Sequence, residues 1–227
     1  MATPETTFDI RREDLSYKAI FAEPQFALLF AAARSFQFLH ARLAPLGLRL
    51  ADIKVEGTAA NPGEFTIVCS LPLRNAALRI RLENIELTAV SPAPAGVLRE
   101  VAATGIEAVR EIAGSNFRRV AVHQVIWEAH GTLELPVLDF LKRYVPVSPW
   151  EGRATGGVSF SIGGDSAGRV AGHAVLAPSV LLEGGLYLQI NANFDGALSV
   201  DSVREGFSSL VQEVGQRLGI APKDGGF

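Results

Sequence analysis

The sequence predicts an α+β fold built from two related halves, each ordered as strand, helix, three or four strands, helix. Two observations predict it. Segments with apolar residues at three- and four-residue intervals occur at matching places in the two halves, and between them lie β-branched or alternating segments separated by Pro, Asn or Gly. The 227 residues are 48% hydrophobic and 20% charged, which is enough to bury a substantial core. We expect antiparallel sheets with helices packed on one face.

The first half begins with a strand and continues through a long amphipathic helix into a group of strands. A strand running into the turn Asn61-Pro62-Gly63 precedes two apolar segments of alternating character. The predicted elements are strand 15–22, helix 26–43, strand and turn 54–63, strand 64–71, the strand pair 76–90 and helix 97–114.

The second half follows the same order. Its turn signal is the glycine-rich stretch that contains Gly163-Gly164-Asp165, and a second loop with Gly184-Gly185 precedes the last strand. The predicted elements are strand 118–129, helix 135–144, strand and turn 158–168, strand 169–180, strand 181–198 and helix 202–219.

The two terminal helices carry the likeness between the halves. When Arg99-Glu100 is aligned with Arg204-Glu205, the apolar positions fall in step, and Gly114 and Gly219 close the two helices at equivalent places. Amphipathic helices also resemble one another without common descent. On the duplication reading the chain divides into an N-terminal segment 1–14, a first repeat 15–116, a second repeat 117–220 and a mobile tail 221–227.

This element order resembles the duplicated saddle of the TATA-binding-protein fold, and each half also resembles a shortened helix-grip unit. The likeness covers most of the chain and is carried by no motif, so it implies a topology and no activity. Reading DNA with a saddle requires a basic concave face. The net charge here is −3, and the last predicted strand carries the uncharged polar residues Tyr187, Gln189, Asn191 and Asn193. We therefore expect no nucleic-acid partner.

The composition of the chain indicates whether it spans a membrane and in which compartment it is expected. The longest apolar segment is interrupted by Arg34, His40 and Arg42, so no membrane span is expected. The start of the chain is polar and does not resemble a secretory signal. The single cysteine, Cys69, lies in an apolar strand and is expected to be a buried, unreactive thiol. These features favour a cytoplasmic protein.

No stretch matches a catalytic, cofactor or metal motif. His123 and His130 lie seven residues apart, which places them on opposite faces of a strand. The glycine-rich stretches lack the Lys-Ser/Thr ending of a phosphate loop and the GxGxxG succession of a dinucleotide site. Carboxylates are scattered singly. We predict no catalytic, cofactor-binding or metal-binding residue, and an enzyme is the less favoured class.

The strand 187–193 carries the most informative polar pattern. Tyr187, Gln189, Asn191 and Asn193 point to one face, although asparagine is disfavoured in strands. Such a row is either a plain solvent-facing surface or a recognition face, to which Trp127, Trp150 and Tyr144 could contribute anchors. All three could equally be core or rim residues.

Two function classes follow. The first is a non-enzymatic binding or assembly protein that acts on a protein partner, or on its own copy, through a sheet face or edge strands. The alternative is a helix-grip-like protein, either an enzyme or a simple carrier, that binds a small apolar ligand in a cavity between helix and sheet.

Overall fold

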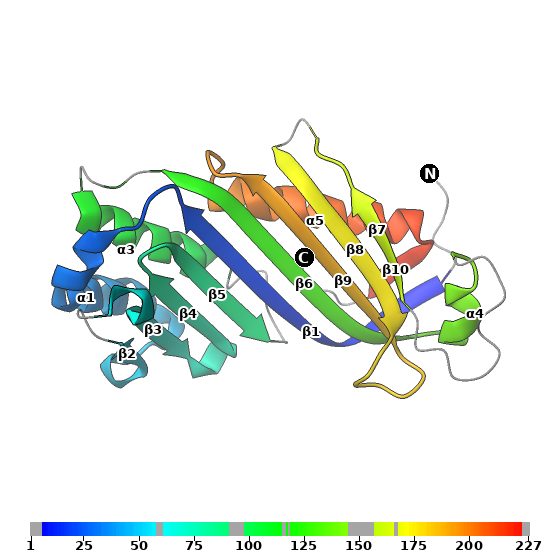
Figure 1. Ribbon diagram of the computed structural model, residues 1–227. Helices are drawn as coiled ribbons and strands as arrows, with labels where there is room; N and C mark the ends of the chain where they lie inside the picture. The colour runs from blue at the N-terminus through cyan, green and yellow to red at the C-terminus, as the bar shows by residue number, and fades with distance from the viewer. Residues whose placement is uncertain are drawn as a thin grey trace.

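The computed structural model describes residues 6–57, 61–90, 98–114, 117, 119–144, 157–165 and 168–223. It has a mixed α+β fold, as the sequence predicts, with a ten-stranded sheet and four α-helices in this described part (Figure 1). Trp150, one of the candidate anchors, and the end of the predicted tail, 224–227, fall outside the described residues.

The strands form one sheet in the order β2-β3-β4-β5-β1-β6-β9-β8-β7, and β10 pairs with β1 from off this path. All neighbours along the path are antiparallel, whereas β10 runs parallel to β1. The strands are β1 (Thr6–Phe21), β2 (Ile53–Glu56), β3 (Thr66–Leu71), β4 (Ala76–Arg81), β5 (Asn84–Val90), β6 (Val120–Leu133), β7 (Val158–Ile162), β8 (Arg169–Pro178), β9 (Leu186–Asp195) and β10 (Ile220–Lys223).

The long helices cover one face of the sheet, and in Figure 1 α3 and α5 lie behind the strands. Glycines let them approach closely: a Cβ on Gly105 of α3 would lie 3.2 Å from atoms of Ile85 and Leu78, and one on Gly206 of α5 would lie 3.0 Å from the Phe194 ring. The helices are α1 (Ala32–Leu43), α3 (Ala103–Ala113), α4 (Val137–Leu141) and α5 (Val200–Arg217). Short helical segments are η1 (Phe26–Phe30), η2 (Ala44–Leu46), η3 (Leu50–Asp52), η4 (Pro62–Glu64), η5 (Pro72–Arg74) and η6 (Leu98–Ala102).

A single hydrophobic core lies between this face and the helices. Period-two alternation places every second side chain of the central strands in that core, for example Tyr17 of β1, Trp127 of β6 and Ile190 of β9. The helices contribute their apolar stripes, such as Phe207 of α5, which is fully buried. Both halves of the chain therefore share one core cluster.

Two expectations are corrected by this architecture. The sequence predicts separate antiparallel sheets, but the structure has one, because β1 and β6, the first strands of the two halves, pair with each other from Phe8–Leu133 to Phe21–Val120. The predicted tail also begins too early. Residues 220–223 form β10 and pair with Thr6–Asp9, so the supposed N-terminal segment is also part of the sheet.

Candidate functional site

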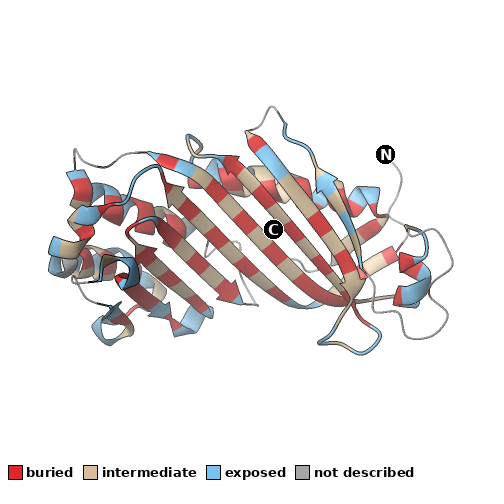
Figure 2. Cartoon of the chain, in the orientation of Figure 1, coloured by how far each residue is buried: buried red, intermediate tan, exposed pale blue. Residues whose placement is uncertain are grey.

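The described helices α3 and α5 lie on one face of the sheet and leave the opposite face uncovered (Figure 1). Along β1, β6 and β9, buried residues alternate with half-buried ones, which appear as red and tan bands in Figure 2. The buried set faces the helices. The half-buried set forms the open face.

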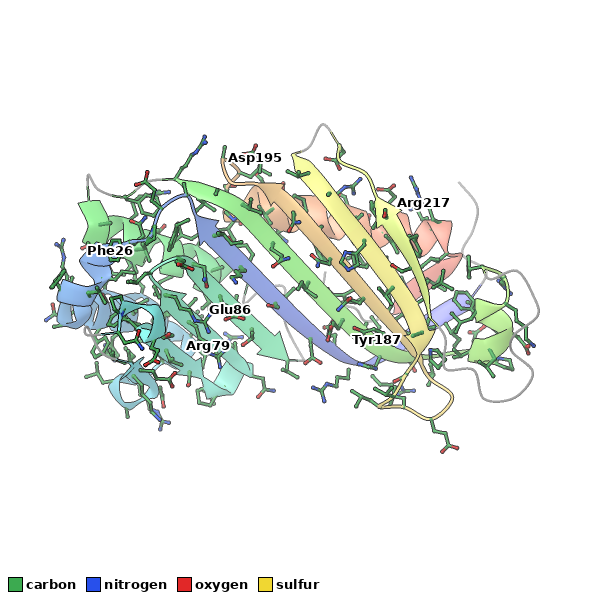
Figure 3. The ribbon with its side chains drawn as sticks, viewed as in Figure 1. Phe26, Arg79, Glu86, Tyr187, Asp195 and Arg217 are labelled. Atoms are coloured by element: carbon green, nitrogen blue, oxygen red, sulfur yellow. The ribbon has the colours of Figure 1, made fainter. Side chains whose placement is uncertain are left out.

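The centre of this open face is rich in uncharged hydrogen-bonding groups. Strand β9 contributes the four polar residues of the row that the sequence singles out, and β6 adds Gln124, which pairs directly with Asn193. All five side chains are half-buried. We call this set the amide patch: Gln124, Tyr187, Gln189, Asn191 and Asn193. Figure 3 shows Tyr187 near one end of β9 and Asp195 at the other. Gln189, Asn191 and Asn193 lie between them along the strand.

One end of the amide patch is fixed by a carboxylate. Glu128 of β6 pairs with Gln189 of β9, and its Oε1 accepts hydrogen bonds from Gln189 Nε2 at 2.6 Å and from the Tyr187 hydroxyl at 3.0 Å. Burial, the hydrogen bond to Glu128 and its negative charge raise the pKa of Tyr187 above its ordinary value. The phenol therefore stays protonated and keeps donating to Glu128.

His130 ties the loop after β8 to this end of the face. The Ser179 hydroxyl accepts the backbone N–H groups of Leu181 and Leu182 at 3.1 and 3.0 Å, so its own proton is free to go to His130 Nδ1 at 2.8 Å. The imidazole also packs on the Tyr187 ring, with 4.9 Å between the ring centroids. This serine and histidine form a structural bond that holds the loop.

The surroundings of His130 favour its neutral form. Burial, followed by the positive charge of Arg12, lowers the pKa of His130, against the opposing effects of Asp14 and Glu128. A neutral ring is what the Ser179 bond requires, because Nδ1 must accept. The two histidines of β6 do lie on opposite faces, and His123 faces the helices.

The other end of the amide patch has unused hydrogen-bonding capacity. Among the described residues, no hydrogen bond reaches the side-chain amides of Gln124, Asn191 or Asn193. Each amide offers two donors and an acceptor to whatever lies above the face. Ile126, which pairs with Asn191, supplies an apolar contact in the same region.

Charges on the open face lie mainly over the first half of the chain and are largely matched. Lys18 and Arg79 pair across the ladder with Glu86, and Arg81 Nη1 lies 2.6 Å from Glu86 Oε2. Figure 3 shows Arg79 and Glu86 side by side on β4 and β5. This surface is not the continuous basic track that a phosphate backbone needs.

Trp127 does not belong to the open face, and its expected role as an anchor there is corrected. It is an odd-numbered residue of β6 like His123, so it points to the helix side, where it is 1% exposed. Its Nε1–H donates to Glu13 Oε2 at 3.0 Å. Tyr144 lies near the end of α5 and donates its hydroxyl proton to the Leu218 carbonyl at 2.7 Å, also away from the amide patch.

Sequence reasoning missed Gln124, Ile126 and Glu128 as members of the site. They come from β6, and only the pairing of β6 with β9 brings them beside the polar row. The available signal was the alternation of β6 itself, in which these residues share a face with His130.

A pocket of about 580 Å³ lies on the opposite side of the molecule, between α3, the start of β6 and the beginning of α5. Ile106, Arg110, Arg119 and Ser199 are among its lining residues, and His123 also contributes to its wall. It therefore combines apolar and charged groups.

His123 is held at this pocket in one tautomer. Its Nε2–H donates to the Leu198 carbonyl at 3.2 Å, so Nδ1 accepts the Tyr17 hydroxyl proton at 2.7 Å. Burial is the main cause that lowers the pKa of His123, and burial raises the pKa of Tyr17. Both groups stay neutral.

Other reactive groups do not assemble into a centre in the described part of the chain. Cys69 is buried, as predicted, and burial raises the pKa of its thiol to about 12. Over the ranges that the structure describes, no three residues of the His, Cys, Asp and Glu types gather as metal ligands would. Nor does any described helix have the length and apolarity to cross a bilayer.

Comparison with known proteins adds no assignment. The chain matches no model of a protein family, and no curated protein is significantly similar to it.

Proposed function

We propose that this chain is a non-enzymatic binding protein whose open sheet face docks a protein partner. The observation that carries the proposal is the amide patch, where the amides of Gln124, Asn191 and Asn193 have no hydrogen bond to any described residue. Asparagine costs stability in a strand, so two of them on β9, an interior strand of the sheet, favour a use beyond folding.

The chemistry of the patch matches the core of a protein interface. Such cores are depleted in charge and combine aromatic or apolar contacts with directed hydrogen bonds. Here Tyr187 and Ile126 supply the contact area, and the amides supply donors and acceptors. The hydrogen bonds from Tyr187 and Gln189 to Glu128 fix part of the surface in advance, which lowers the entropy lost on docking.

We further propose that the face is assembled from two duplicated halves, residues 15–116 and 117–220. Supporting this, the first strand of each half lies beside the last strand of the same half, β1 beside β5 and β6 beside β9. In both halves a helix follows the first strand and another follows the last. The β1–β6 seam then joins the two units into a saddle-like sheet, which gives a broad face to a partner.

The test is to recover the tagged chain from its own cells under native conditions and to quantify what accompanies it. Asn191→Lys combined with Asn193→Lys places two charges in the amide patch, and we expect at least about a tenfold loss of the partner, equivalent to about 1.4 kcal/mol. The control is Gln212→Lys combined with Gln216→Lys on the exposed side of α5, which adds the same charge on the opposite side. Equal recovery with both variants would contradict the proposal.

A second candidate rests on the 580 Å³ pocket beside His123. Its volume is in the range of small-molecule sites, and it lies between helix and sheet as the helix-grip alternative requires. A ligand for it must tolerate both Ile106 and the two arginines that line it. Ala103→Phe would fill part of the pocket. A compound that raises the melting temperature of the wild type, and not of this variant, would support the candidate.

A further inference from the structure

The outer edge of β7 has no strand partner in the part of the chain that the structure describes, and β7 carries no charged residue. Strand β7 (Val158–Ile162) ends the sheet, and its only strand partner among the described residues is β8. Its five residues, VSFSI, carry no charge and no proline. An edge of this kind offers backbone N–H and C=O groups to another strand.

The opposite edge strand of the sheet, β2, carries features that prevent pairing with another chain, and β7 does not. There β2 (Ile53–Glu56) has only four residues, and two of them, Lys54 and Glu56, are exposed charges. Charged side chains on a short strand are a common defence against pairing with other chains. Strand β7 lacks that defence.

The sequence of β7 is complementary to itself in an antiparallel pair. With Phe160 on a twofold axis, Phe160 faces Phe160, Val158 faces Ile162, and Ser159 faces Ser161. The apolar side chains are half-buried and pack against the core, whereas both serines are exposed. Apolar residues thus meet apolar residues on the helix side, and hydroxyls meet hydroxyls on the open face.

Glycines flank β7 at both ends, and one of them, Gly163, leaves room for an approaching strand. Gly157 precedes it, and Gly163 and Gly164 follow it. No atom lies within 4 Å of the place where a Cβ on Gly163 would be. Open space is therefore present at Gly163, whereas a Cβ on Gly157 or Gly164 would meet the backbone of β8 at 2.7 or 2.8 Å.

We propose that two copies of this chain associate through β7, antiparallel and with Phe160 opposite Phe160, so that their sheets join into one. A twofold contact of this kind is closed, because each copy uses its single β7 edge. The joined sheet places the amide patches of both copies on one continuous open face. This dimer is independent of the partner proposed above, since it uses the strand edge and leaves the patch free.

The test measures the mass of the full chain by sedimentation over a wide range of concentrations. The wild type is expected to approach twice the 24.2 kDa mass of one chain as concentration rises. Ser159→Lys with Ser161→Lys places lysine opposite lysine at both serine pairs, and the dissociation constant should rise about tenfold. A wild type that stays monomeric throughout, or a dimer that this variant does not weaken, overturns the proposal.

A matched variant tests the register. Ser159→Lys with Ser161→Glu changes the same two residues, but in the proposed register each lysine faces a glutamate, so dimerisation should equal or exceed that of the wild type. A register shifted by two residues would instead bring one of the two positions, 159 or 161, opposite its own copy, so that like charges face each other there, and would weaken this variant as well. That result would contradict the Phe160 axis.

Disulfide crosslinking tests the same contact without the lysine variants, which could fold poorly. Phe160→Cys places one cysteine on the proposed axis, opposite its own copy, and mild oxidation should give a disulfide-linked dimer. The control is Ser70→Cys, at an exposed position on β3 of the other half, which should remain uncrosslinked. Equal crosslinking at both positions, or none at position 160, would sink the proposal.

Discussion

At the residue scale, the buried polar pairs are what the sequence could not predict. The period-two rule correctly places His123 and His130 on opposite faces, because it depends only on local geometry. Their partners Tyr17 and Ser179 lie 106 and 49 residues away in the chain. Such pairs depend on the sheet order, which no local pattern contains.

The Tyr17–His123 bond should matter to stability. Tyr17→Phe keeps the ring in its fully buried place but leaves His123 Nδ1 without its donor, so unfolding should become easier by about 1–3 kcal/mol. Urea denaturation measures this. In a His123→Phe background the same change should cost much less, because the acceptor is already gone. An equal cost in both backgrounds would show that the bond contributes nothing.

Acid should destabilise the fold through the histidines of β6. The pKa values of His123 and His130 are both lowered from the ordinary 6.5, so below that pH the unfolded chain binds protons that the folded chain does not. The contribution of these two histidines to the free energy of unfolding is therefore fully present above pH 6.5. It decreases as the pH falls below 6.5.

His123→Gln isolates one part of this acid effect. The glutamine amide can still accept from Tyr17 and donate to Leu198, but it does not titrate. Urea denaturation of this variant should show a shallower loss of stability below pH 6.5 than the wild type. An unchanged slope would mean that His123 is not part of the acid response.

At the scale of elements, strands were easier to predict than their pairing. Alternation and turn residues place most strands within a few residues of where they lie, and the polar side of β9 follows from the same rule. For Trp127 the ring type alone leaves both an anchor and a core role open, and its odd position in β6 assigns it to the core. The short strand β10 has too few residues for a visible pattern, and its partner β1 is at the other end of the chain.

The antiparallel pairing of β1 with β6 requires the two backbones to lie close together near Gly131. Gly131 pairs with Ile10 beside a register shift, and a Cβ there would overlap the Asp9 carbonyl and lie 2.7 Å from the Phe8 ring. Gly131→Ala should lower stability by about 1–3 kcal/mol in thermal or urea unfolding.

The matched control is Gly63→Ala, where the nearest atom to the new Cβ is 3.9 Å away and stability should change little. Equal effects at the two glycines would refute this packing account.

At the scale of the whole molecule, one sheet and one core join the two halves. The alternative of two separate sheets is compatible with every local pattern, because the β1–β6 seam pairs residues that are 99 (Phe21 with Val120) to 125 (Phe8 with Leu133) positions apart in the chain. The β1–β6 seam extends the open face across both halves, whereas the amide patch lies within the second half, where β6 pairs with β9.

The shared core predicts one unfolding transition. Tyr17, Trp127 and Phe207, which come from both halves of the chain, belong to the same buried cluster, so neither half can lose its core alone. Tryptophan fluorescence and far-UV circular dichroism should give coincident denaturation curves. Two separated transitions would instead indicate halves that fold independently.

The central claim is that the open face meets a protein in the cell. The most direct measurement places a photo-crosslinking amino acid at position 191, in the amide patch, and separately at position 216 on exposed α5, in the native cells. We predict that irradiation gives a discrete protein adduct from position 191 and none of that adduct from position 216. The same adduct from both positions, or none from position 191, would contradict the account.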